Sequence, residues 1–125
     1  MISLIDMNCR VFRDAHNIYD VQFWVDKDNG NIKSKSKYFE VTYPVKSLKK
    51  IVLYKRDVKD YLVEFYCKND GKCIKSKDNE TKDISTQSSY SVNLTSSQVI
   101  GDKVIAAFKT IVKEMGGKLI QDEDE

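Results

Sequence analysis

The feature that most constrains this chain is the alternation of apolar and polar residues, which recurs in short stretches before residue 95. A repeat of two predicts a strand with one buried face. Seven such strands with no helix between them favour an antiparallel barrel or sandwich over a parallel sheet. We expect them at roughly residues 9–12, 21–25, 32–43, 50–54, 61–67, 72–75 and 89–94.

Turn residues separate several of these stretches. Asp28-Asn29-Gly30 predicts a tight turn, because Gly and Asn tolerate positive φ. Asn69-Asp70-Gly71 predicts a three-residue hairpin with glycine in the left-handed position, so that residues 72–75 return antiparallel to residues 61–67. Residues 77–88 are polar and predict a mobile loop.

A helix is predicted at the C-terminal side, over about residues 97–115. Thr95 and Gln98 have the spacing of a capping box, and Gly116-Gly117 is a typical helix stop. The apolar residues recur at helical spacing and would form one stripe that packs on the sheet. They are Ile100, Val104, Phe108, Ile111 (or Ala107) and Met115, with Val112 beside the stripe.

Length and composition fit one globular domain, which we place at residues 1–121. The last four residues, 122–125, are all acidic, and we expect a disordered tail there. The chain has no run of 18 apolar residues and no secretory signal at its start. We therefore expect a cytoplasmic protein without a transmembrane segment.

The order of elements, short antiparallel strands followed by one long helix, resembles that of pleckstrin-homology-like (PH-like) domains. Three stretches also resemble uncharacterised bacterial domains of that superfold. They are residues 43–51 (YPVKSLKKI), 63–74 (VEFYCKNDGKCI) and 104–118 (VIAAFKTIVKEMGGK). The resemblance covers roughly residues 20–118. It implies a mainly β (α+β) fold, a seven-stranded partly open barrel with the helix plugging one end, and a binding platform without catalytic residues.

Lysines are concentrated in the middle of the chain. Lipid-binding PH domains carry a basic motif in the first hairpin that ends Lys/Arg-x-Arg, and Lys35-Ser36-Lys37 resembles it without the final arginine. The alternating lysines equally fit a charged edge strand that prevents aggregation, or a solvated surface. The candidate ligand or lipid-binding residues are Lys33, Lys35, Lys37, Lys49 and Lys50.

Cys67 and Cys73 would face each other across the expected hairpin. Free thiols are the favoured interpretation for a cytoplasmic protein, and a disulfide or a shared metal is the alternative. The spacing matches no common zinc motif, and the remaining ligands, Cys9 and His16, are distant in sequence. We expect no metal and no cofactor.

Catalytic groups are scarce, so we expect no enzyme. Asp20, Glu40 and Glu64 show no sign of converging, and His16 reads as a solvated loop residue. Three arginines among 21 basic residues disfavour nucleic acid, because arginine makes the bidentate phosphate contacts.

Three functions remain. The leading hypothesis is a non-catalytic module that binds a protein segment at a sheet edge or beside the helix. A module for anionic membrane surfaces is second, and a small-ligand or hydrolytic domain with a pocket in the barrel mouth is third.

Overall fold

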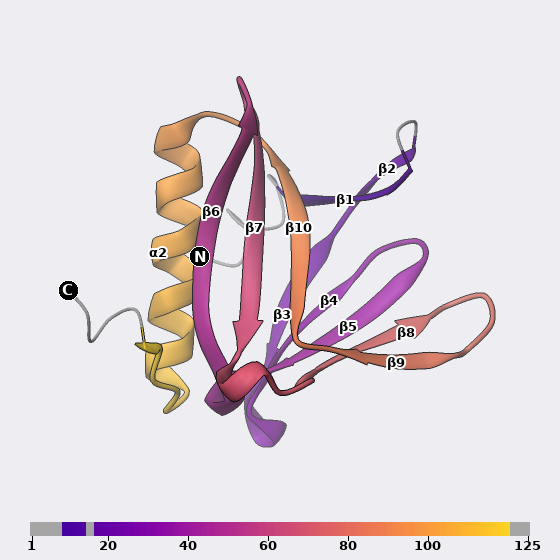
Figure 1. Cartoon of the computed structure of the whole chain (residues 1–125), viewed down its shortest axis with the longest axis vertical. Helices are drawn as coiled ribbons and strands as arrows, with labels where there is room; N and C mark the ends of the chain where they lie inside the picture. The colour runs from indigo at the N-terminus through magenta and orange to yellow at the C-terminus, as the bar shows by residue number, and fades with distance from the viewer. Residues whose placement is uncertain (1–8, 15–16, 121–125) are drawn as a thin grey trace.

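The computed structural model describes the backbone of residues 9–14 and 17–120, and the side chains of residues 21–120. Within this part of the chain, ten strands form two five-stranded antiparallel sheets, which are accompanied by one C-terminal α-helix (Figure 1). The expectation of a mainly β, α+β fold is confirmed, whereas the described residues contain ten strands and not the seven expected. In sheet A the strand order is β2-β1-β10-β7-β6, and in sheet B it is β3-β4-β5-β8-β9.

The strand bounds are as follows. Sheet A contains β1 (Cys9–Asp14), β2 (Asn17–Asp20), β6 (Leu48–Asp57), β7 (Asp60–Cys67) and β10 (Ser89–Thr95). Sheet B contains β3 (Gln22–Asp26), β4 (Asn31–Lys35), β5 (Phe39–Pro44), β8 (Ile74–Asp78) and β9 (Ile84–Gln87).

The expected strand over residues 32–43 is two strands, β4 and β5, which pair with each other. A turn at Ser36 separates them. The backbone N–H of Ser36 donates to the carbonyl of Phe39 at 2.8 Å, and the Phe39 N–H donates to the Ser36 hydroxyl at 3.2 Å. Lys37 therefore lies in a turn rather than in a strand. The turn predicted at Asp28-Asn29-Gly30 is confirmed, with Gly30 at φ +69° after the 3-10 turn η1 (Lys27–Asn29).

The loop expected over residues 77–88 is wrong, because most of this segment is a hairpin of β8 and β9. Side-chain bonds to the backbone order its polar turn. The Asp78 carboxylate accepts hydrogen bonds from the N–H groups of Glu80 (2.9 Å) and Thr81 (3.1 Å). The Asn79 amide donates to the carbonyls of Ser36 and Lys37, which ties this turn to the turn between β4 and β5.

The hairpin expected at Asn69-Asp70-Gly71 is also wrong, because β7 and β8 belong to different sheets. The 3-10 turn η3 (Lys68–Asp70) carries the chain from sheet A to sheet B, where β8 pairs with β5. Asn69 and Asp70 take the left-handed conformation, both at φ 55°, whereas Gly71 has φ −69°. Two residues that tolerate positive φ thus redirect the chain out of its sheet.

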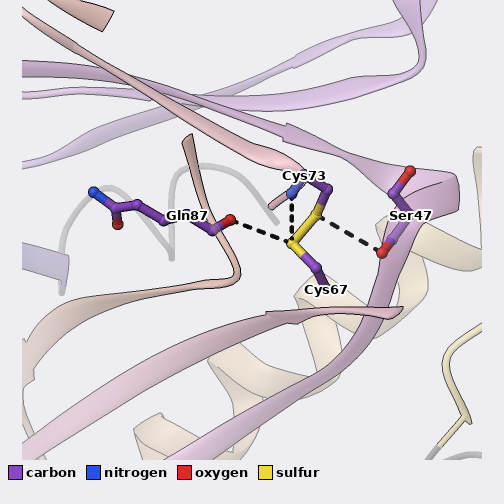
Figure 2. Close-up of a disulfide and its surroundings, with 4 residues drawn as sticks. All are labelled: Ser47, Cys67, Cys73 and Gln87. Atoms are coloured by element: carbon purple, nitrogen blue, oxygen red, sulfur yellow. Dashed lines mark hydrogen bonds between the residues drawn. A yellow bond between two sulfur atoms is a disulfide. The ribbon is translucent and has the colours of Figure 1, made fainter. Parts of the chain in front are cut away.

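A disulfide joins Cys67 at the end of β7 to Cys73 just before β8, with the Cα atoms 5.8 Å apart (Figure 2). The free-thiol prediction is therefore wrong for this structure. It rested on the expected compartment, whereas the pairing follows from η3, which folds the chain back so that the two cysteines meet. The Cys73 N–H donates to the Cys67 sulfur at 3.2 Å.

The disulfide lies where three crossings between the sheets meet, and we call this place the crossing corner. The crossings are the 3-10 turn η2 (Val45–Ser47) between β5 and β6, η3 between β7 and β8, and Ser88 between β9 and β10. The Cys67 N–H donates to the Ser88 carbonyl at 2.9 Å. Figure 2 shows the Cys73 sulfur facing the Ser47 carbonyl, at 3.8 Å.

The core between the sheets and the helix centres on four aromatic rings. Phe23 of β3, Phe65 of β7 and Phe108 of the helix α2 (Gln98–Glu114) pack around one another, with Phe108 5.1 Å from each of the other two ring centroids. Tyr43 packs against Phe65 in a tilted arrangement, with the ring centroids 4.4 Å apart. Phe108 thus links both sheets to the helix, which packs along β6 (Figure 1).

The C-terminal helix is confirmed, and its apolar stripe is buried or partly buried as expected. Its N-cap is Ser97 rather than the predicted Thr95, because the Ser97 hydroxyl accepts from the Ile100 N–H at 3.3 Å. Gly116, at φ +83°, ends the helix as predicted. No helix in the described residues is long and apolar enough to cross a membrane. Residues 122–125, the expected tail, lie outside the described residues.

Replacing Phe108 with alanine should lower the free energy of unfolding by about 3–5 kcal/mol, because the change leaves a cavity where both sheets meet the helix. Urea denaturation measures this loss. Val99→Ala, on an exposed position of the same helix, is the matched control and should change the free energy of unfolding by less than about 0.5 kcal/mol. Equal losses in the two variants would contradict the role given to Phe108.

Reducing the disulfide should lower the free energy of unfolding by about 2 kcal/mol, which is the chain-entropy value for a loop closed over 6 positions. Urea denaturation with and without dithiothreitol measures the difference. A Cys67→Ser/Cys73→Ser variant should unfold at one urea concentration whether or not the reductant is present. If the urea midpoint of the wild type is also the same with and without dithiothreitol, the disulfide does not stabilise the domain.

Candidate functional site

The strand register of sheet B gathers lysines on its outer face. In β4 the side chains of Ile32 and Ser34 are buried, so Lys33 and Lys35 point outward. In β8 the buried residues are Ile74 and Ser76, so Lys75 and Lys77 point outward as well. Directly paired residues share a face, and the pairs run across β5 in two rows. The rows are Trp24–Lys33–Thr42–Lys75–Thr86 and Gln22–Lys35–Glu40–Lys77–Ile84.

These two rows, together with Lys37 in the adjoining turn, form what we call the basic face. Strand spacing places Lys33 about 10 Å from Lys75 across the sheet, and Lys33 about 7 Å from Lys35 along the strand. Among the ten residues of the rows, Glu40 is the one carboxylate, and its oxygen lies 3.7 Å from the Lys33 ammonium. Lys35, Lys37, Lys75 and Lys77 are exposed, so their charges face solvent.

Two apolar side chains stand at opposite edges of the basic face. Trp24 on β3 is 36% exposed, and Ile84 on β9 is 65% exposed. Single exposed apolar residues are ordinary on a protein surface, and at these two positions they flank basic groups, as apolar residues do where a protein lies on a membrane. The face therefore combines positive charge with apolar contacts at its margins.

The structure brings together three of the five lysines predicted from the sequence. Lys35 and Lys37 line one shallow hollow of about 280 Å³ with Gln22 and Ser36, and Lys33 lies in the adjacent row. Lys49 and Lys50 lie on β6 in the other sheet. The Lys50 ammonium sits over the Tyr66 ring, 4.9 Å from its centroid.

Sequence reasoning missed Lys75 and Lys77. It placed residues 72–75 in a hairpin with β7 and residues 77–88 in a loop, so neither lysine was assigned to a strand beside β5. The alternation Ile74-Lys75-Ser76-Lys77 was the available signal, because it repeats the pattern Ile32-Lys33-Ser34-Lys35 of β4. Two strands with the same pattern fit the same sheet.

The space between the sheets offers little room for a small ligand. A cavity lined by Ser34, Ser36 and Tyr90, together with apolar side chains, has a volume of only about 10 Å³. That is close to the volume one water requires. Ser34 and Tyr43 bond to each other through their hydroxyls at 3.0 Å, and every buried side-chain polar atom in the described residues has a partner. This cavity is too small for an organic ligand, and a larger hollow of about 320 Å³ lies instead between β3 and the helix, where Val25, Ile111 and Met115 line it.

Two of the acidic residues considered for catalysis, Glu40 and Glu64, lie in different sheets. Glu40 lies on the outer face of sheet B, whereas Glu64 lies on β7 in sheet A, where its carboxylate accepts from the Ser91 hydroxyl at 3.3 Å. The side chain of Asp20 and all of His16 lie outside the described residues. The described part of the chain contains no cluster of three or more His, Cys, Asp or Glu that could hold a metal.

Two tyrosines on sheet A have shifted acidity. Burial raises the pKa of Tyr90 to about 12, because an ionised phenolate would be poorly solvated between the sheets. Burial, followed by the neighbouring Glu64 carboxylate, raises the pKa of Tyr66. Neither tyrosine belongs to the basic face, so these shifts concern stability rather than binding.

Comparisons with protein-family models, with curated proteins and with solved structures found no match to this chain. The resemblance to PH-like domains therefore stays a prediction, and function has to be inferred from the residues and geometry of this chain.

Tyr90 should cause part of the loss of stability at high pH. Its folded pKa of about 12 lies above the ordinary value of 10.0, so its contribution to stability is complete below pH 10 and is lost as the pH rises through about 12. Tyr90→Phe should flatten this part of the curve of unfolding free energy against pH. Tyr54→Phe, at an exposed ring, should leave the curve unchanged. Identical curves for wild type and Tyr90→Phe would refute the assignment.

Proposed function

We propose that this domain is a non-catalytic interaction module whose basic face binds the anionic headgroups of a membrane surface. The observation that carries the proposal is the pairing of β4, β5 and β8, which puts Lys33, Lys35, Lys75 and Lys77 on one outer face with a single carboxylate in the two rows. An array of ammonium groups spread over several strands matches a layer of headgroups better than it matches a compact ligand.

The energetic basis is additive attraction at short range. A lysine near an anionic leaflet contributes about 1 kcal/mol, and the attraction falls off over about 8 Å at physiological ionic strength. Four lysines on one face can approach the surface together, whereas lysines on two sheets cannot. Trp24 and Ile84 would then enter the headgroup layer at the margins of the face.

The coarse architecture supports a binding platform. The PH-like assignment is part of this proposal, and the two antiparallel sheets with a C-terminal helix are compatible with it. That assignment would make the outer surface, rather than an interior cavity, the place where partners bind.

A protein partner is the second candidate, and the edge strand β9 favours it. β9 pairs with β8 on one side and forms the end of sheet B, and no described strand pairs with its other edge, which could accept an added strand. Ile84, Ser85 and Thr86 are exposed along it. An acidic segment added to this edge would lie beside Lys77 and Lys75.

Replacing both Lys75 and Lys77 with glutamine should weaken binding to vesicles that contain anionic lipid. Two lysines at about 1 kcal/mol each correspond to roughly a 30-fold fall in the partition coefficient at physiological salt. Vesicle sedimentation measures it, with neutral vesicles as the blank. These two positions are informative because the sequence alone did not point to them.

The matched control is Lys55→Gln/Lys103→Gln, which removes the same charge from exposed positions on β6 and α2. It should bind like the wild type. An equal fall in both double variants would mean that only net charge matters. Absence of vesicle binding in the wild type, with binding to an acidic peptide that Lys75→Gln/Lys77→Gln abolishes, would replace the membrane with a protein partner.

A further inference from the structure

A second group of lysines meets in a hollow at the crossing corner, which the proposed function does not use. The hollow has a volume of about 400 Å³ and opens to solvent. Its walls come from η2 on one side and from the loop that follows β7 on the other. The residues that line it include Lys46, Ser47, Lys68, Asn69, Lys72 and Cys73.

The chemistry of this corner hollow is that of an anion site. Three of the residues that line the hollow are lysines, Lys46, Lys68 and Lys72, and the lining residues in the described structure include no carboxylate. The Ser47 hydroxyl and the Asn69 amide add neutral donors. A tetrahedral oxyanion has several acceptor oxygens and can accept hydrogen bonds from all of these donors. Hydrogen bonds between an ammonium group and an anionic oxygen are stronger than those between neutral groups.

The fold, rather than the sequence, brings these groups together. Lys46 lies between β5 and β6, whereas Lys68 and Lys72 lie between β7 and β8. Lys46 is also placed by the end of helix α2, because its Cε atom lies 3.6 Å from the position that a Cβ atom on Gly116 would occupy.

The disulfide closes the ring that forms one wall of the hollow. Residues 68–72 lie between Cys67 and Cys73, so this bond holds both ends of the segment that carries Lys68, Asn69 and Lys72. Cys73 itself lines the hollow. A fixed loop binds more tightly, because less conformational entropy is lost on binding.

The corner also accommodates the reduced state. A dithiol reductant would supply two electrons and two protons, so that the S–S bond breaks, two thiols form and the reductant becomes a disulfide. The Cys67 sulfur lies 3.6 Å from the Gln87 carbonyl and the Cys73 sulfur 3.8 Å from the Ser47 carbonyl (Figure 2). Each new S–H group would therefore have a carbonyl acceptor. The loop would lose its covalent closure, while both sulfur atoms kept these hydrogen-bond partners.

We propose that the corner hollow binds a phosphate-class oxyanion, and that it does so in the disulfide form of the domain. The shared chemistry is a phosphate group with at least two negative charges, carried either by a soluble compound or by a lipid headgroup. The site is separate from the basic face, because its lysines lie in the connections between the sheets and not on the outer face of sheet B.

The test is a titration of the full chain with pyrophosphate, followed by amide NMR shifts. Saturable shifts are expected at Ser47 and at residues 68–73. Lys68→Gln/Lys72→Gln should raise the dissociation constant about tenfold or more. Reduction with dithiothreitol should raise it about threefold or more, and reoxidation should restore it. Retained dispersion of the core amide signals would show that the reduced domain is folded.

The control arms separate this site from the basic face. Lys75→Gln/Lys77→Gln should bind pyrophosphate like the wild type, and Lys68→Gln/Lys72→Gln should bind vesicles of phosphatidylserine like the wild type. Vesicles that contain phosphatidic acid distinguish the two sources of the phosphate group. Amide shifts at residues 68–73 on addition of these vesicles would identify a lipid headgroup as the ligand. Shifts with pyrophosphate but not with the vesicles would identify a soluble compound. Shifts that do not saturate, an equal loss in both double variants, or a dissociation constant unaffected by reduction would overturn the proposal.

Discussion

The passage of the chain from one sheet to the other directly after Cys67 is the constraint on which the remaining structure depends. A continued hairpin would have kept β8 beside β7, in sheet A. Because Asn69 and Asp70 adopt positive φ, the chain instead enters sheet B, and the disulfide to Cys73 holds the crossing in place. β8 then pairs with β5, and this pairing puts Lys75 and Lys77 in the same rows as Lys33 and Lys35. The fold of the corner thus determines the charge pattern of the outer face of sheet B.

The aromatic core fixes the same arrangement from inside. Phe23 belongs to sheet B, Phe65 to sheet A and Phe108 to the helix, so their packing holds the two sheets and the helix in one relative position. Tyr43 extends this packing along β5, the strand at the centre of the basic face. Successive side chains of a strand point to opposite faces of the sheet. The inward side chains of sheet B therefore stabilise the core, and the outward side chains of the same strands form the basic face.

The sequence predicts the parts of this structure that depend on local patterns. Alternation located most strands, the spacing of Val104 and Phe108 located the helix, and Gly116 marked its end. Pairing between distant strands has no comparable local signal. The choice between β7 and β5 as the partner of β8 depends on η3, whose Asn-Asp-Gly residues fit a hairpin equally well. Lys33, Lys35 and Lys37 were therefore found, whereas Lys75, Lys77 and the corner hollow required the tertiary structure. The sequence correctly predicted that Cys67 and Cys73 lie close together. The expected cytoplasmic location, however, led to a prediction of free thiols, whereas the structure has a disulfide.

The pairing of β5 with β8 is the central claim, and backbone nuclear Overhauser effects between the two strands test it most directly. The register predicts contacts between Thr42 and Lys75 and between Glu40 and Lys77. Observation of these contacts would establish that one sheet carries all four lysines. Contacts from β8 to Phe65 or Tyr66 of β7 would show instead that the chain continues as a hairpin, and the basic face would not exist.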